Sequence, residues 1–200
     1  MQAIEYVLGI LLACAVSDAR SRCKQDLLGA TLEYMPDAWQ LIDKHRLQFH
    51  LMFTSKGGLN DSNYKCLTTL KTEAIRKYKW ERKLFYSVFP NENTTRISWS
   101  VVGSRKASEC HVYDNLITAS DSKGRKKPDW RSNVLYTDYK TCVLLSSRRL
   151  GYQVWAAKDY VREHREIPYI CVLLYEVYAG LVKHWVYDWN VCSSRTSKII

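Results

Sequence analysis

The sequence lacks the motifs that most catalytic and cofactor sites require. It has no Gly-x-Ser-x-Gly nucleophile elbow, no phosphate-binding loop and no His-Glu-x-x-His zinc motif. His164 and Glu166 are not accompanied by the cysteine pair of a zinc deaminase. A Cys-x-x-Cys pair, which a structural zinc site or a redox centre would use, is also missing. We therefore expect no enzyme, no cofactor and no bound metal.

Long hydrophobic runs are scarce too. The longest covers residues 6–16, which is too short to span a bilayer comfortably and matches the apolar core of a secretory signal. Ala15 and Ser17 are small residues suited to cleavage, although Glu5 precedes the run and no Lys or Arg does. The alternative is a buried N-terminal helix. We interpret residues 1–17 as a signal peptide and residues 18–200 as one secreted, extracellular domain, because no repeat or linker divides them.

Export determines what the cysteines can do. Cys14 leaves with the signal, and an even number of cysteines in an oxidising compartment favours three disulfides. The remaining cysteines are Cys23, Cys66, Cys110, Cys142, Cys171 and Cys192. The sequence alone leaves their pairing open. Two Asn-x-Ser/Thr acceptor sites, at Asn60 and Asn93, agree with secretion and predict surface glycans.

The chain carries a formal net charge of +10. Such an excess suits nucleic acid, anionic polymers, anionic membranes or an anionic ligand. The basic residues are scattered, however, except in residues 123–127, which Ser, Gly and Pro residues surround. We interpret this run as a solvated loop in preference to a polyanion site, and we expect neither nucleic acid nor a membrane as a partner.

The sequence predicts one short helix followed by many strands. Pro36 and Asp37 suit the first turn of a helix that ends near Lys44. Residues 46–53 then alternate as a strand with one dry and one wet face. The dry face carries Leu47, Phe49, Leu51 and Phe53, and the wet face carries Arg46, Gln48 and His50.

Residues 76–89 form the most informative predicted strand, because its apolar face includes an arginine. That face carries Tyr78, Trp80, Arg82, Leu84, Tyr86 and Val88, and the next strand adds Thr95, Ile97, Trp99 and Val101. We expect both sets to point into one barrel together with Leu47, Phe49 and Leu51. Pro168 marks the start of a helix, and alternating bulk predicts a strand that ends at Cys192. Many short alternating strands are typical of a sandwich or a closed barrel.

Six landmarks, in order, give the chain a family resemblance. They are Asp37-Ala38-Trp39, Tyr64-Lys65-Cys66, Tyr136-Thr137-Asp138 before Cys142, Gly151-Tyr152-Gln153-Val154-Trp155, Ile167-Pro168 before Cys171, and Cys192. With these landmarks the chain resembles the tick salivary lipocalins, above all the histamine-binding group. The resemblance implies an all-β, eight-stranded antiparallel lipocalin barrel with a short N-terminal helix and a C-terminal helix packed outside. It also implies the disulfides Cys66–Cys192 and Cys142–Cys171, which leaves Cys23 and Cys110 for a third.

The resemblance also indicates where a ligand would bind. Amine-binding relatives carry an acid after the cysteine at position 142 and a Glu at position 153, but here these positions hold Val143 and Gln153. Trp155 and Trp130 match pocket aromatics. Together with the inward Arg82, Trp80 and Trp99, this set predicts a pocket for a neutral or anionic amphiphile. The alternatives are that Arg82 reaches the barrel rim or pairs with a buried acid such as Asp114, and that the tryptophans only pack the core.

We therefore predict a secreted salivary lipocalin that sequesters a small host mediator, such as a fatty acid or an eicosanoid. Two alternatives remain open. One is an immunomodulator that binds a host protein through the barrel loops. The other is a binder of histamine or serotonin whose pocket is rearranged.

Overall fold

The computed structural model describes residues 27–32, 34–43, 48–57, 59, 64–75, 78–91, 94–109, 111–121 and 130–195. The predicted signal peptide lies outside the described residues, as do Cys23, Cys110, Asn60 and Asn93. The third disulfide and the two glycans therefore stay predictions.

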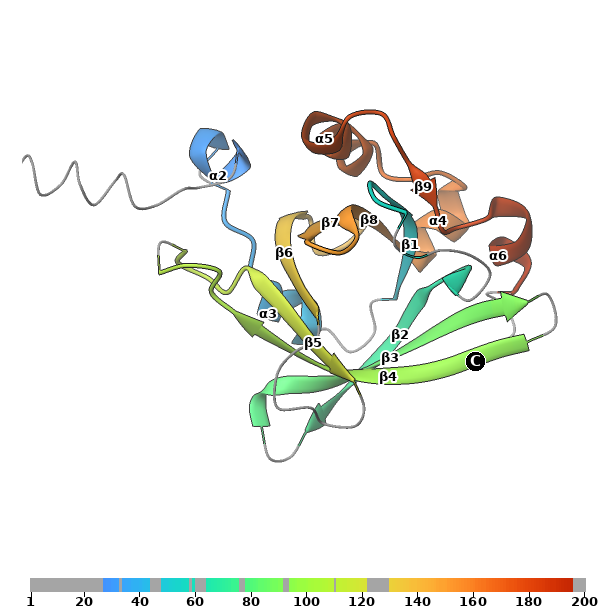
Figure 1. The fold of residues 1–200 in the computed structure, drawn as a ribbon, viewed down its shortest axis with the longest axis horizontal. Helices are drawn as coiled ribbons and strands as arrows, with labels where there is room; N and C mark the ends of the chain where they lie inside the picture. The colour runs from blue at the N-terminus through green and yellow to red at the C-terminus, as the bar shows by residue number, and fades with distance from the viewer. Residues whose placement is uncertain are drawn as a thin grey trace, which may run out of the picture.

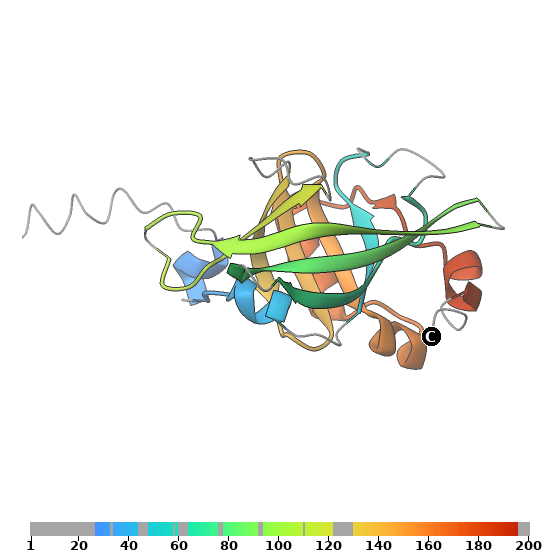
Figure 2. The same ribbon diagram turned by 90° about the horizontal axis from the view of Figure 1, so that it is seen from below.

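Eight antiparallel strands close into a barrel, which confirms the predicted fold (Figures 1 and 2). The strands are β1 (Phe49–Thr54), β2 (Thr68–Ile75), β3 (Tyr78–Asn91), β4 (Thr94–Arg105), β5 (Leu116–Asp121), β6 (Trp130–Thr137), β7 (Cys142–Ser147) and β8 (Gly151–Ala157). Neighbours in sequence pair from β2 to β8, then β8 pairs with β1 and β1 with β2. A closed ring leaves no long unpaired edge.

The predicted N-terminal helix is present as α3 (Ala38–Asp43), and it covers one end of the barrel. The Asp37 carboxylate accepts hydrogen bonds from the backbone N–H groups of Trp39 and Gln40, which starts the helix. Ala38 is buried against Phe49 and Ala157, where β1 begins and β8 ends. We call this the closed end. The opposite end, which carries the β7–β8 turn of residues 148–150, is the mouth.

The prediction that β1 has a wet face is wrong, because all six of its residues are buried. The helix α5 (Tyr169–Ala179) and the short strand β9 (His184–Trp185) lie outside the barrel. The ring of Phe53 contacts Tyr175 of α5 at 4.8 Å and Trp185 of β9 at 5.0 Å between centroids. An irregularity in pairing after Leu51 gives Phe53 this outward direction. Both faces of β1 therefore belong to a core.

The C-terminal segment completes the barrel wall between β1 and the residues that lead into β2. The N–H of Val186 donates to the carbonyl of Met52, and the N–H of Cys66 donates to the carbonyl of Val186. The predicted strand ending at Cys192 is wrong beyond Trp185. The Asp188 carboxylate instead accepts from the N–H groups of Asn190 and Val191 and starts the helix α6 (Trp189–Arg195).

Both disulfides that the family resemblance implied are confirmed. Cys66–Cys192 ties the start of β2 to α6 with a Cα–Cα distance of 5.4 Å, and Cys142–Cys171 ties β7 to α5 at 6.4 Å. On the chain-entropy account, closing loops of these lengths stabilises the fold by about 5 and about 4 kcal/mol. The C-terminal third is thus fastened covalently to the barrel.

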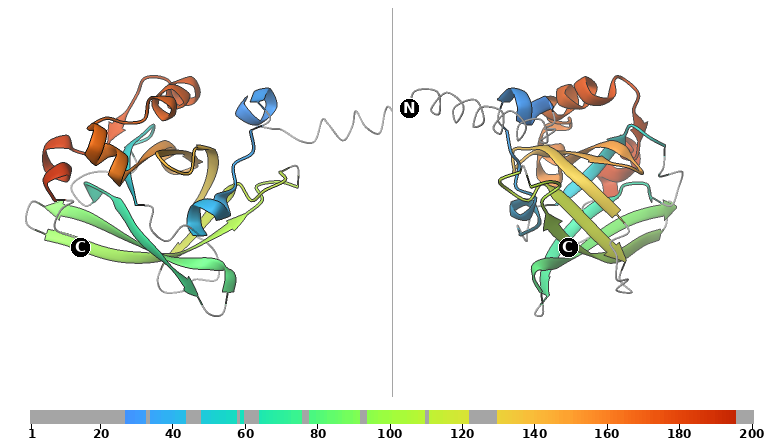
Figure 3. Two further views of the ribbon diagram at one scale, coloured as in Figure 1. Left: turned by 180° about the vertical axis from the view of Figure 1, so that it is seen from behind. Right: turned by 60° about the vertical axis from the view of Figure 1, so that its left-hand side comes forward.

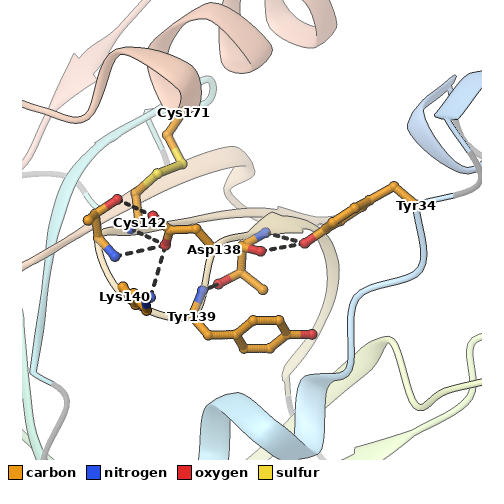
Figure 4. The surroundings of a disulfide bond; sticks show 8 residues. Tyr34, Asp138, Tyr139, Lys140, Cys142 and Cys171 are labelled. Atoms are coloured by element: carbon orange, nitrogen blue, oxygen red, sulfur yellow. Dashed lines mark hydrogen bonds between the residues drawn. A yellow bond between two sulfur atoms is a disulfide. The ribbon is translucent and has the colours of Figure 1, made fainter.

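The β6–β7 turn holds Cys142 in position for its disulfide (Figure 4). The Asp138 carboxylate accepts from the N–H groups of Lys140, Thr141 and Cys142. Burial raises the pKa of Asp138, but these bonds and the one from the Thr141 hydroxyl outweigh it and hold the pKa below its ordinary value. The Tyr34 hydroxyl bonds to the Thr137 backbone from the N-terminal side.

Apart from α6, the helices outside the barrel wall gather on the side away from the long β3–β4 hairpin (Figures 1 and 3). They are α2 (Leu27–Leu32), α4 (Lys158–His164) and α5. The N–H of Leu28 in α2 donates to the hydroxyl of Tyr178 in α5 at 3.2 Å. Among the described residues, no helix is long and apolar enough to cross a membrane.

Candidate functional site

The strands β6, β7 and β8 line one side of the barrel interior. Their register places Leu145 opposite both Val134 and Gln153, and Val143 opposite Trp155. Residues opposite one another in antiparallel strands point to the same face. Because Val134 and Val143 pack with Ala38 of α3 inside the barrel, Gln153 and Trp155 face the interior as well. Both were predicted to bind ligand; their direction allows it, and binding stays a prediction.

Gln153 joins the inward polar groups into a short chain of hydrogen bonds. Its Nε2 donates to Ser147 Oγ at 3.0 Å, and its Oε1 accepts from the Trp155 indole N–H at 3.3 Å. Only 3% of Gln153 is exposed. A buried amide with two partners stabilises the wall and leaves one donor and one acceptor site for a ligand. The interior at this position is polar but uncharged.

Trp130 lies at the mouth, where β6 begins, and it pairs with Ala119 of the neighbouring strand β5. The Arg149 guanidinium, from the neighbouring β7–β8 turn, stands 4.5 Å from the centre of the Trp130 ring. That distance is well within the range of a cation–π contact. Arg149 and its neighbour Arg148 are exposed, and the Lys56 ammonium donates to the Arg148 carbonyl at 3.2 Å. The mouth therefore presents basic side chains beside an indole.

Arg82 lies on the inward face of β3 at the closed end, and only 7% of it is exposed. Its guanidinium forms an ion pair with the Asp43 carboxylate of α3 and stands 5.8 Å from the centre of the Trp39 ring. Asp114, which one alternative named as a partner for Arg82, instead accepts a hydrogen bond from the Ser104 hydroxyl. Arg82 points inward as predicted, but helix α3 already supplies it with an anion.

The predicted inward direction of Trp99 is wrong. The β3–β4 register pairs Trp99 with Phe85 and Leu84 with Ser100, so Trp99 and Leu84 point to opposite faces. Leu84 shares the face of Arg82, whereas Trp99 lies outside with the Lys83 ammonium 5.1 Å from its ring centre. Ile97 is also outside and exposed. Trp80 lies in β3, and its side chain is not among those described.

A second polar cluster, which the sequence did not reveal, lies in the wall beside β2. His50 is 3% exposed, its Nδ1 is 2.8 Å from Thr68 Oγ1, and its ring is 5.0 Å from that of Tyr187. Burial, and to a lesser extent Lys158, lowers the pKa of His50 to about 4. A cavity of about 10 Å³, which would hold at most one water, adjoins it. His50 is a neutral structural residue.

The described residues contain no cluster of His, Cys, Asp or Glu that could hold a metal ion. The inward side chains and the mouth form the candidate site. Arg149 is the residue that sequence reasoning missed. The only signal for it was a pair of arginines before Gly151, and nothing in the sequence placed that turn against Trp130.

Comparisons with known proteins agree with the fold. A family model described as tick histamine binding protein matches residues 29–194. No curated protein sequence matches the chain. Among solved structures, the serotonin complex of AM182 has a TM-score of 0.58 at 13% sequence identity, and the alignment covers 79% of this chain and 94% of that one. This likeness supports the fold alone.

Two further solved structures have lower TM-scores. Japanin from Rhipicephalus appendiculatus, bound to cholesterol, has a TM-score of 0.49 at 19% identity, with 76% of this chain and 97% of that chain covered. The siderocalin Ex-FABP, described as having dual ligand specificities, has a TM-score of 0.45 at 11% identity, with 69% and 83% covered.

Proposed function

The chain belongs to the tick histamine-binding protein family, and from this membership we propose that it is a secreted lipocalin that sequesters a small host mediator inside its barrel. The proposed ligand is a neutral or anionic amphiphile, such as a fatty acid or an eicosanoid. Its tail would lie among the inward apolar side chains, and its polar group would lie at the mouth.

The contact between Arg149 and Trp130 is the observation that carries this proposal. An amine ligand needs an aromatic face or a carboxylate to replace the water around its ammonium group. At the mouth, the protein's own guanidinium already covers the indole face. A second cation there would meet like-charge repulsion, whereas a carboxylate would gain a charge-assisted hydrogen bond.

The inner wall supports the same ligand class. The positions where the resemblance places the two amine-pairing acids hold Val143 and Gln153, and both face the interior. Burying an ammonium without a carboxylate partner typically costs several kcal/mol, about 3–5 in the best-studied buried pairs. The Gln153 amide can instead bond to a hydroxyl or carbonyl along an amphiphile.

The position of Arg82 changes where we expect the carboxylate to bind. A guanidinium cannot lose its proton at physiological pH, so it requires an anion or water. Asp43 provides the anion at the closed end. We therefore place the ligand's head group near Arg149 and not near Arg82.

Calorimetry with palmitic acid, methyl palmitate and histamine tests the proposal. We expect the acid to bind in preference to the ester, and histamine to bind at least a thousandfold more weakly than the acid. Arg149→Gln should weaken the acid about tenfold, or ~1.4 kcal/mol, and leave the ester nearly unchanged. Arg148→Gln is the matched control, because it removes an equal charge that does not contact Trp130. Nanomolar binding of histamine would overturn the proposal in favour of a rearranged amine pocket.

A further inference from the structure

The helix α5 is apolar on both of its faces. Cys171 and Tyr175 are fully buried against the barrel. On a helix of 3.6 residues per turn, an arc of about 100° on the opposite side holds four exposed apolar residues. They are Tyr169, Ile170, Leu173 and Val177. A surface helix normally carries polar side chains on its outer face, and one that is apolar all round is normally buried.

Exposed apolar side chains continue beyond the end of the helix at Gly180. Leu181 is 79% exposed, and Val182 and Trp185 are exposed as well. We call the seven residues the outer stripe: Tyr169, Ile170, Leu173, Val177, Leu181, Val182 and Trp185. Twelve large hydrophobic side chains are exposed among the described residues, and seven of them fall in this one short segment. Such a concentration marks an interaction surface and not the ordinary scatter of surface hydrophobics.

The outer stripe is electrically neutral, although the chain as a whole carries +10. Between residues 169 and 185 the charged residues are Glu176 and Lys183, and their side chains bond to each other at 2.5 Å. A basic groove for a polyanion, or a basic rim for an anionic membrane, would need unpaired cations here. Two copies can touch through the stripe without juxtaposing like charges, because its one acid and its one base are paired with each other.

We propose that the outer stripe binds a second copy of this chain. Two stripes related by a twofold axis would pack α5 against α5, with Val177 and Leu173 near the centre. Seven large side chains that each expose roughly 100 Å² supply about 700 Å² per copy, close to the roughly 800 Å² of a standard interface. The stripe faces away from the barrel interior, so the dimer does not depend on any ligand.

Sedimentation velocity on the full secreted protein, from 1 to 100 µM, tests the proposal. We expect a concentration-dependent dimer in the wild type. Val177→Glu should shift the midpoint of dimerisation at least a hundredfold, because it would bury two like charges in the interface. Ile97→Glu is the matched control, since Ile97 is 56% exposed, as is Val177, but lies on β4. Near-UV circular dichroism shows whether each variant is folded. If Val177→Glu does not fold, Leu181→Glu replaces it, because Leu181 lies outside the helix.

A wild type that stays monomeric at 100 µM would overturn the proposal, and so would a dimer that Val177→Glu and Leu181→Glu leave intact. A monomer that binds phosphatidylcholine vesicles or a host protein through the stripe would also overturn it, by assigning the surface to another partner. Loss of the dimer in the stripe variants alone, with Ile97→Glu unaffected, supports it.

Discussion

The two ends of the barrel hold the same pair of side-chain types in opposite circumstances. At the closed end, Arg82 lies over Trp39, is buried and is paired with Asp43. At the mouth, Arg149 lies over Trp130 and is exposed. A guanidinium on an indole therefore does not by itself indicate a ligand site. The burial of the cation and its ion-pair partner decide whether it stabilises the fold or is available to an anionic ligand.

Replacing Asp43 gives the largest expected difference in stability between substitutions at the two ends. Asp43→Asn should lower the free energy of unfolding by about 3 kcal/mol, because a buried guanidinium loses its counter-charge. Arg82→Gln should cost less, since the Asp43 side chain is 51% exposed and returns to water. Urea denaturation measures both. Arg149→Gln is the control from the mouth and should change stability by less than about 0.5 kcal/mol. An equal loss for Asp43→Asn and Arg149→Gln would break the comparison.

Lowering the pH tests the contribution of His50, in the barrel wall between the two ends, and leaves both guanidinium groups charged. The pKa of His50 is about 4 in the folded protein and 6.5 in the unfolded chain. The unfolded chain therefore takes up its proton first, and stability falls as the pH drops from 6.5 towards 4. The loss from this residue should reach about 2 kcal/mol at pH 5.

His50→Gln isolates this effect, because an amide does not titrate. Urea unfolding between pH 8 and pH 5 should show a flatter dependence for the variant than for the wild type. Identical slopes would show that His50 is protonated to the same extent in both states. Above pH 6.5, ligand affinity should depend on the charge of the side chains at the mouth and not on the protonation of His50.

The fold was predictable from the sequence because local pattern and family landmarks agree. Alternation identified β3, Pro36 and Asp37 identified α3, and the family resemblance implied the two disulfides. These features depend on residues close in sequence, or on a framework that a whole family shares. The helix start after Pro168 is another such local feature.

The errors arise where distant segments meet. Alternation shows which residues of a strand share a face with Trp99, but only the hairpin register shows whether that face is inside the barrel. The register pairs Trp99 with Phe85, on the outside. His50 was assigned to solvent because nothing in β1 shows that residues 184–187 pack over it. The partner of Arg82 is Asp43 of α3 and not Asp114. Candidate site residues can thus be chosen from sequence, while their direction and charge partners require the fold.

A single measurement distinguishes the mouth from the closed end as the place where the ligand's charge binds. Palmitate labelled with ¹³C at its carboxyl carbon can be titrated in the complex by NMR, which reports the pKa of the bound acid. We predict that this pKa rises in Arg149→Gln, because a nearby cation is lost, and does not change in Arg82→Gln or Arg148→Gln. A rise in Arg82→Gln with no change in Arg149→Gln would place the carboxylate at the closed end and contradict the account.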